Sequence, residues 1–133
     1  MVERQGDWAD KLVILHHVSP AVIHWDILIH PHGAPQLWAW RCLIDPASWF
    51  ILSDMVCSTL IRLPDHRLKY LDYVGPVSGN RGWVRPVLRH KAAVKSHTDA
   101  EIHLATRAGD STWVWTLKHI RGDRWNLEVG RIE

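Results

Sequence analysis

Hydrophobic and polar residues alternate along positions 22–30 (VIHWDILIH), a pattern typical of a β-strand with two different faces. One face carries His24 and Asp26, two residues apart and pointing the same way. Just upstream, His16 and His17 end another apolar run. This face is either the solvated side of a half-buried strand or, together with a histidine from the neighbouring strand, part of a divalent-metal ligand set. The opposite face is wholly apolar and belongs in a core; it consists of Ile23, Trp25, Ile27 and Ile29.

Short apolar segments of the same kind occupy most of the remaining chain. They span residues 12–15, 37–43, 57–63, 84–89, 92–95, 101–106, 112–120 and 124–132. Turn-forming residues separate them, as at positions 31–35, 108–111 and 121–124. Many short strands with regular turns in one small chain predict a mainly β fold, a small closed or nearly closed antiparallel β-barrel.

We expect one or two short helices beside the strands. Asp45 followed by Pro46 is a typical helix start. His66, Tyr70 and Tyr73 share a face at helical spacing, so residues 65–73 form either a short helix or an irregular loop. The expected organisation is a single domain over residues 1–133, with residues 1–11 as a flexible arm.

Composition narrows the classes of protein only slightly. The chain has 133 residues, a formal net charge of +2 and a pI near 8.7, a mild basic balance that permits a nucleic-acid partner without requiring one. Most of the nine tryptophans lie within apolar alternation, so we expect them to be core or barrel-wall residues. Without a signal segment, a membrane-length apolar run or a CxxC pair, the chain is expected to be a soluble, cytoplasmic monomer.

Two motifs in order resemble a known family. The first is HVSPAVIHWD at positions 17–26, and the second is DHRLKYLDYVG at positions 65–75, with LWA at positions 37–39 between them. This ordered set is similar to the phosphoesterase domain of bacterial DNA ligase D, which also occurs as small stand-alone proteins. The resemblance covers roughly residues 12–130, nearly the whole chain.

The resemblance implies a small β-barrel with a polar crevice and removal of a 3′-phosphate or a terminal 3′-ribonucleoside during DNA end joining. It implies a metal, manganese before zinc or cobalt, held by His17, Asp26 and His66, with His16 as an alternative first ligand. It further implies that His24 and Tyr70 act on the phosphate. Expected partners are nucleic-acid 3′ ends and DNA ligase or polymerase repair proteins.

The chain departs from the family pattern at two positions where the family has phosphate-binding arginines, now Leu28 and Ser58. His17 and His24 are also one residue further apart than the family usually has them. Arginine matches the geometry of phosphate oxygens, so a replacement is expected. Our first choice is Arg62, four residues before His66 and on the same strand face as position 58; the other candidates are Arg41, Arg81 and Arg85.

Three functions are consistent with these residues. The leading one is a manganese-dependent 3′-phosphoesterase. The second is a catalytically weak or inactive barrel that binds nucleic-acid ends or a ligase or polymerase partner. The third is a small-molecule-binding barrel whose histidines hold a metal incidentally.

Overall fold

The computed structural model describes residues 8–46 and 54–132, which form strands and one short 3₁₀ helix. The strands are β1 (Asp10–Val18), β2 (Ile23–His30), β3 (Gln36–Cys42), β4 (Asp54–Arg67), β5 (Gly75–Pro76), β6 (Trp83–His97), β7 (Glu101–Ala108), β8 (Ser111–Arg121) and β9 (Arg124–Ile132). The 3₁₀ helix, η3 (Leu68–Leu71), follows β4 directly. None of the helices in these described ranges is long and apolar enough to span a membrane.

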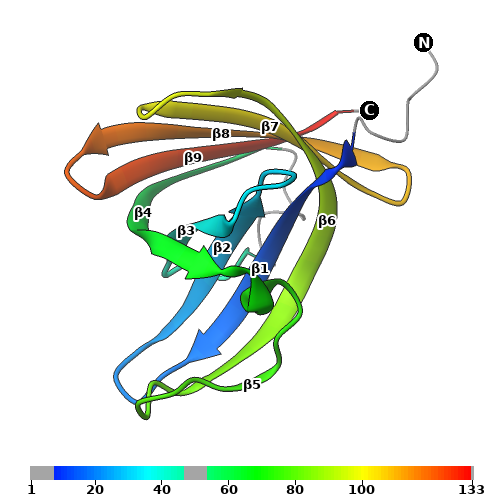
Figure 1. Cartoon of the computed structure of the whole chain (residues 1–133). Helices are drawn as coiled ribbons and strands as arrows, with labels where there is room; N and C mark the ends of the chain where they lie inside the picture. The colour runs from blue at the N-terminus through cyan, green and yellow to red at the C-terminus, as the bar shows by residue number, and fades with distance from the viewer. Residues whose placement is uncertain (1–7, 47–53, 133) are drawn as a thin grey trace.

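The strands form one antiparallel sheet in the order β1-β2-β3-β4-β9-β8-β7-β6-β5. An additional pairing of β1 with β6 closes the sheet, with His17 opposite Val84 and Lys11 opposite Lys91. The result is the antiparallel β-barrel predicted from the pattern of short strands (Figure 1). The short β5 lies outside this closed circuit and pairs only with the start of β6.

The interior of the barrel is filled by the side chains that point inward from each of the long strands. Trp40, Trp115 and Leu127 are fully buried there, and Ile27 and Ile29 belong to the same cluster. The expectation for the apolar face of β2 is wrong at Ile23, which begins the strand and is 53% exposed. Trp25 and Trp38 pack against the cluster and are partly buried, whereas the other alternating tryptophans, Trp40, Trp113 and Trp115, are core positions as expected. Burying such large side chains stabilises the barrel by about 2–3 kcal/mol each at the usual area coefficient.

A second apolar cluster lies on the outer face of strands β1 to β3. The segment 68–84, which includes η3 and β5, places Leu71 and Val77 against Val13, Leu28 and Ala39. The face of β2 that carries His24 and Asp26 was expected to be either solvated or metal-binding. This segment buries it, and Leu28 on the same face is 0% exposed. Both faces of β2 are covered, one by the barrel interior and the other by this segment.

Two of the expected boundaries in β1 and β6 are wrong. Residues 84–95 form one strand, β6, because the inward-facing His90 lies 3.1 Å from Thr106 Oγ1 and so continues the alternation. β1 begins at Asp10, inside the range expected for the N-terminal arm, and the Asp10 carboxylate accepts a hydrogen bond from the His32 amide. Most of the helix expected after Asp45 falls at positions 47–53, outside the described residues.

The expected end of β4 at Pro64 is also wrong, because β4 continues to Arg67. Leu37 pairs with His66 but Ala39 pairs with Leu63, so Pro64 and Asp65 form a bulge. A bulge accommodates a proline that cannot donate to the ladder. It also shifts the alternation by one, which places His66 on the outer face with Leu63. The helix considered for residues 65–73 is reduced to η3.

We predict that the close approach of Gly82 to β1 is essential for holding the segment 68–84 in place. Gly82 has φ +92°, and a Cβ there would lie 1.9 Å from the Val18 carbonyl oxygen, which is backbone and has no alternative rotamer. Gly82→Ala should lower the free energy of unfolding by about 3 kcal/mol or more, which exceeds the 1–2 kcal/mol of a left-handed backbone alone.

Gly109→Ala is the matched control, because Gly109 has φ +59° with open space around it. Urea denaturation measures both variants. Equal destabilisation of the two variants would contradict the proposed role of the Gly82–Val18 contact.

Candidate functional site

Three side chains with metal-ligating atoms converge on the outer face of β1 and β2. His17 on β1 is the direct cross-strand partner of His24 on β2, and their ring centroids lie 4.4 Å apart. Asp26 follows two residues after His24 on the same face. Its Oδ2 lies 3.3 Å from His17 Nδ1 and its Oδ1 lies 3.2 Å from His24 Nε2. One ligating atom from each of the three residues fits within 4.8 Å of the others.

Both ring nitrogens of His17 face acceptors. Nδ1 donates to Asp26, and Nε2 donates to the Arg81 backbone carbonyl at 2.7 Å. A histidine that binds a metal commonly donates its second N–H to a carbonyl, which fixes the ring and its tautomer. If a metal replaces the Nδ1 proton, the Arg81 contact fixes the His17 ring so that Nδ1 is the atom available to ligate it. His16 lies on the other face, stacked on Trp25, and is not part of this cluster.

His24 is the least satisfied polar group of the site. Its side chain is 2% exposed, and neither ring nitrogen has a hydrogen-bond partner among the described residues. The same holds for Asp26 Oδ1, because the contact between the two lacks hydrogen-bond geometry. Buried polar atoms in folded proteins are nearly always paired, so these atoms have unused capacity for a ligand. Two imidazoles and one carboxylate are a donor set that suits a divalent metal, so the residues fit the group that the motifs imply.

The electrostatics of the cluster keep Asp26 ionised. Burial alone would raise the pKa of this carboxyl group, but the contacts with His17 and His24 outweigh burial and lower the pKa to about 2. The hydrogen bond to Asp26 raises the pKa of His17 above its ordinary value, against the opposing effect of burial. The metal-free site is thus a carboxylate beside a histidine that readily carries a proton.

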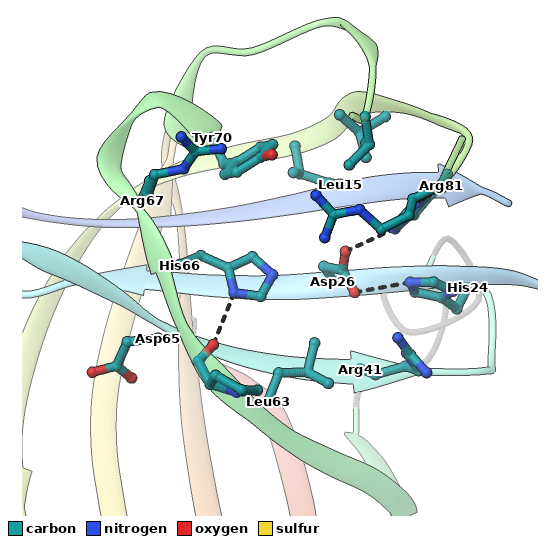
Figure 2. A pocket seen from close by; sticks show the side chains of 14 residues that line it. Leu15, His24, Asp26, Arg41, Leu63, Asp65, His66, Arg67, Tyr70 and Arg81 are labelled. Atoms are coloured by element: carbon teal, nitrogen blue, oxygen red, sulfur yellow. Dashed lines mark hydrogen bonds and ion pairs between the residues drawn. The ribbon is translucent and has the colours of Figure 1, made fainter. Parts of the chain in front are cut away.

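His66 and Tyr70 reach the same cavity from the opposite side. The bulge in β4 turns His66 outward, and its Nδ1 donates to the Pro64 carbonyl at 2.8 Å, which leaves Nε2 free to accept or to ligate. Figure 2 shows the ring of His66 directed across the cavity toward Asp26. Tyr70 on η3 lies edge-on to His66, with ring centroids 5.9 Å apart. His66 lines the cavity but is not in the tight group of three.

The cavity enclosed by these residues has a volume of about 410 Å³. Three arginines line it, namely Arg41, Arg67 and Arg81. Arg41 on β3 is the cross-strand partner of Asp26, and its Nε is buried without a hydrogen-bond partner among the described residues. Arg81 is held by Ser78, with Nε 2.6 Å from the Ser78 carbonyl. Figure 2 shows Arg41 and Arg81 on opposite sides of Asp26 and His24.

Arg62, our first choice for the phosphate-binding arginine, does not line this cavity. It is the cross-strand partner of Trp40 and lies over the Trp40 ring at 4.4 Å, with an ion pair to Asp65 at 3.1 Å. The bulge explains the difference, because it places Arg62 and His66 on opposite faces of β4. Arg85 is also elsewhere, beside His16 and Trp25.

Arg41 and Arg81 were among the candidates from sequence, whereas Arg67 was not. Arg67 directly follows His66, which could have identified it as a candidate. It was missed because the strand was expected to end before Pro64, whereas β4 continues to Arg67. Of the two positions where the family has arginine, Leu28 is part of the second apolar cluster. The side chain of Ser58 lies outside the described part of β4.

No protein-family model matches the chain, and no curated protein matches it significantly. The resemblance to the ligase D phosphoesterase domain therefore rests on the motifs alone.

We predict a distinct pH dependence for the stability of the metal-free protein. The folded-state pKa of Asp26 is lowered from 3.8 to about 2, so its contribution to stability is present above pH 3.8 and is lost as the pH falls through about 2. The raised pKa of His17 has the opposite sign, so its contribution is present below pH 6.5 and is lost as the pH rises through the folded-state value. The two shifts share the His17–Asp26 contact, and the whole Asp26 shift, to which His24 also contributes, is worth about 2 kcal/mol at 1.36 kcal/mol per pKa unit.

Urea denaturation in EDTA between pH 2 and pH 8 measures this contribution. Wild type should gain stability relative to Asp26→Asn as the pH rises from about 2 to 4, and part of that gain should disappear above pH 6.5. Parallel curves for the two proteins would show that the carboxylate is not stabilised by its histidine neighbours.

Proposed function

We propose that the chain is a divalent-metal-dependent phosphoesterase that acts on 3′ ends of nucleic acid, removing a 3′-phosphate or a terminal 3′-ribonucleoside. The observation that carries the proposal is the buried His24, whose ring nitrogens make no hydrogen bond among the described residues, beside Asp26 and His17 in a cavity that also holds three arginines. A metal-binding set next to several guanidinium groups is suited to a phosphate ester, because both parts favour an anion. The motif resemblance supplies the choice of 3′ ends and of DNA end repair, with a ligase or polymerase as partner.

The residues that would hold the metal are His17 through Nδ1, Asp26 through a carboxylate oxygen, and one further histidine. The resemblance selects His66 as that histidine, whereas the short distances in the cavity favour His24. Manganese is the first candidate, with zinc or cobalt as alternatives. When bound, such an ion offsets charge on a phosphate oxygen and lowers the pKa of its bound water.

The remaining groups of the cavity act on the phosphate itself. Arg41 and Arg81 flank the cluster and donate to non-bridging oxygens, which stabilises the charge that develops there. The histidine that is not a ligand, His24 or His66, donates a proton to the leaving oxygen. Tyr70 at the rim donates its hydroxyl proton in a hydrogen bond to the same phosphate.

We predict that hydrolysis of a 3′-phosphorylated oligonucleotide with Mn²⁺ depends on the buried cluster. Asp26→Asn removes the anionic ligand and should lower kcat/KM about a thousandfold, the effect of losing several kcal/mol of charge stabilisation. His24→Ala and His66→Ala should both impair turnover. Mn²⁺ binding, measured by calorimetry, separates their roles, because only the variant that loses a ligand loses metal affinity.

Asp65→Asn is the matched control, since Asp65 lines the cavity but its carboxylate pairs with Arg62. Its activity should stay within about threefold of wild type. Absence of turnover by pure, metal-loaded wild-type protein would refute the phosphoesterase assignment.

A second prediction separates the arginines. Arg41→Gln removes a charged donor from the cavity and should lower kcat/KM about 10- to 100-fold, as expected for a hydrogen bond to a charged group worth about 1.5–3 kcal/mol. Arg62→Gln, on the inner face with Trp40, should change it less than about threefold. Steady-state kinetics on variants with wild-type circular dichroism provide the test, and a larger loss in Arg62→Gln would reverse our assignment.

One observation favours the non-enzymatic alternative, a barrel that binds nucleic-acid ends or a repair partner without turnover. Leu28 is buried against Leu71 and Val77, so an arginine cannot enter there without disrupting the second apolar cluster. Leu28→Arg is therefore not a rescue for this chain. Tight binding of 3′-phosphorylated DNA without product, with Mn²⁺ bound at the cluster, would establish this alternative.

A further inference from the structure

Cationic side chains face one another across the outer surface of the barrel. Lys11 on β1 is directly opposite Lys91 on β6, and Lys91 is directly opposite Arg107 on β7. Their chain neighbours Leu12 and Ala92 belong to the interior cluster, so the lysines point outward. Like charges in directly opposed positions destabilise a sheet, and the fold gains no packing from the two exposed lysines. This arrangement suits a polyanion that neutralises them.

Arg89 extends this positive surface toward the cavity. Together with Lys11 and Lys91 it lines a second hollow of about 260 Å³, bounded on the other side by Leu71 and Asp72. Asp72 is the one acidic residue among those that line the hollow, and its carboxylate is 86% exposed and 4.0 Å from Arg89. We call the residues Lys11, Arg89 and Lys91 the basic track.

The carboxylate of Asp10, next to Lys11, does not neutralise the track. Its two oxygens accept hydrogen bonds from the backbone amides of His32, at 2.6 Å, and Val94, at 2.8 Å. Three cations against one exposed carboxylate, that of Asp72, leave the hollow with a net positive charge.

The basic track is connected to the candidate site by shared elements. Lys11 and His17 lie on the same face of β1, six residues apart, which corresponds to about 20 Å. The helix η3 separates the two hollows, with Tyr70 lining one and Leu71 the other. The Lys69 ammonium group of η3 lies over the rings of Tyr70 and Tyr73, 5.1 and 5.0 Å from their centroids. It adds a positive charge on the helix that separates the two hollows.

We infer that the basic track is a binding surface for the phosphate backbone of a nucleic-acid strand whose 3′ end occupies the cavity. This inference rests on the proposed function for the placement of the 3′ end. One strand of a duplex carries a charge every 3.4 Å or so, so the 20 Å separation spans about six phosphates. A small phosphate ester in the cavity does not reach Lys11 or Lys91, whereas a longer strand contacts both.

The test compares the double variant Lys11→Gln/Lys91→Gln with the control Arg121→Gln/Arg124→Gln, which removes two exposed, directly opposed positive charges from the turn between β8 and β9. Binding of a 3′-phosphorylated strand of about 20 nucleotides is measured by fluorescence anisotropy at several salt concentrations. We expect the track variant to bind at least tenfold more weakly at low salt. Its slope of log K against log salt should fall by about 1.4, from two lost phosphate contacts at 0.7 each. The control should match wild type.

A second substrate separates this inference from the proposed function. A dinucleotide with a 3′-phosphate fits the cavity alone, so the track variant should hydrolyse it with Mn²⁺ at the wild-type rate while losing kcat/KM on the long strand. No hydrolysis of either substrate, with strand binding still dependent on Lys11 and Lys91, would refute the enzyme and support the track. Normal hydrolysis with equal strand binding by the track and control variants would refute the track and leave the enzyme standing.

Discussion

The candidate site depends on the packing of residues 68–84 on the outer face of the barrel. Leu71 and Val77 cover Val13 and Leu28, and the same segment brings the Arg81 carbonyl to within 2.7 Å of His17 Nε2. Without this cover, His24 and Asp26 would lie on an ordinary solvated strand face. Burial makes the unpaired atoms of His24 costly and strengthens the electrostatic effect of every neighbouring charge. The apolar contacts thus create the environment in which a metal-binding cluster is effective.

The cavity and the basic track together make a consistent electrostatic picture. In the proposed function, Asp26 would supply the anionic ligand for a cation, and the surrounding arginines would supply positive charge for an anionic substrate. A metal ion with a phosphate bound to it carries charges of both signs, so both kinds of group are needed in one cavity. The track on β1 and β6 extends the positive charge along the path that a longer strand would follow. The modest net charge of +2 conceals this local concentration.

Sequence reasoning succeeded where local alternation determines the structure. It identified the barrel, the core tryptophans and the shared face of His24 and Asp26, because these follow from a period of two residues. It placed Arg62 wrongly, because the bulge at Pro64 and Asp65 breaks that period between Arg62 and His66. The proximity of Arg41 to Asp26 depends on the register of β2 against β3, and the pairing of Lys11 with Lys91 depends on barrel closure. Such contacts between distant segments leave no periodic signal in the chain.

The central claim is that the outer-face cluster of β1 and β2 binds a divalent metal. The most direct test is anomalous X-ray diffraction from crystals soaked in Mn²⁺. A metal bound at this cluster should give one strong anomalous peak at roughly 2.0–2.2 Å from His17 Nδ1 and an oxygen of Asp26, with His24 or His66 completing the protein ligands. A fully occupied Mn²⁺ site in another part of the protein, with no anomalous peak between His17 and Asp26 and with His17 still donating to Asp26, would contradict metal binding by this cluster.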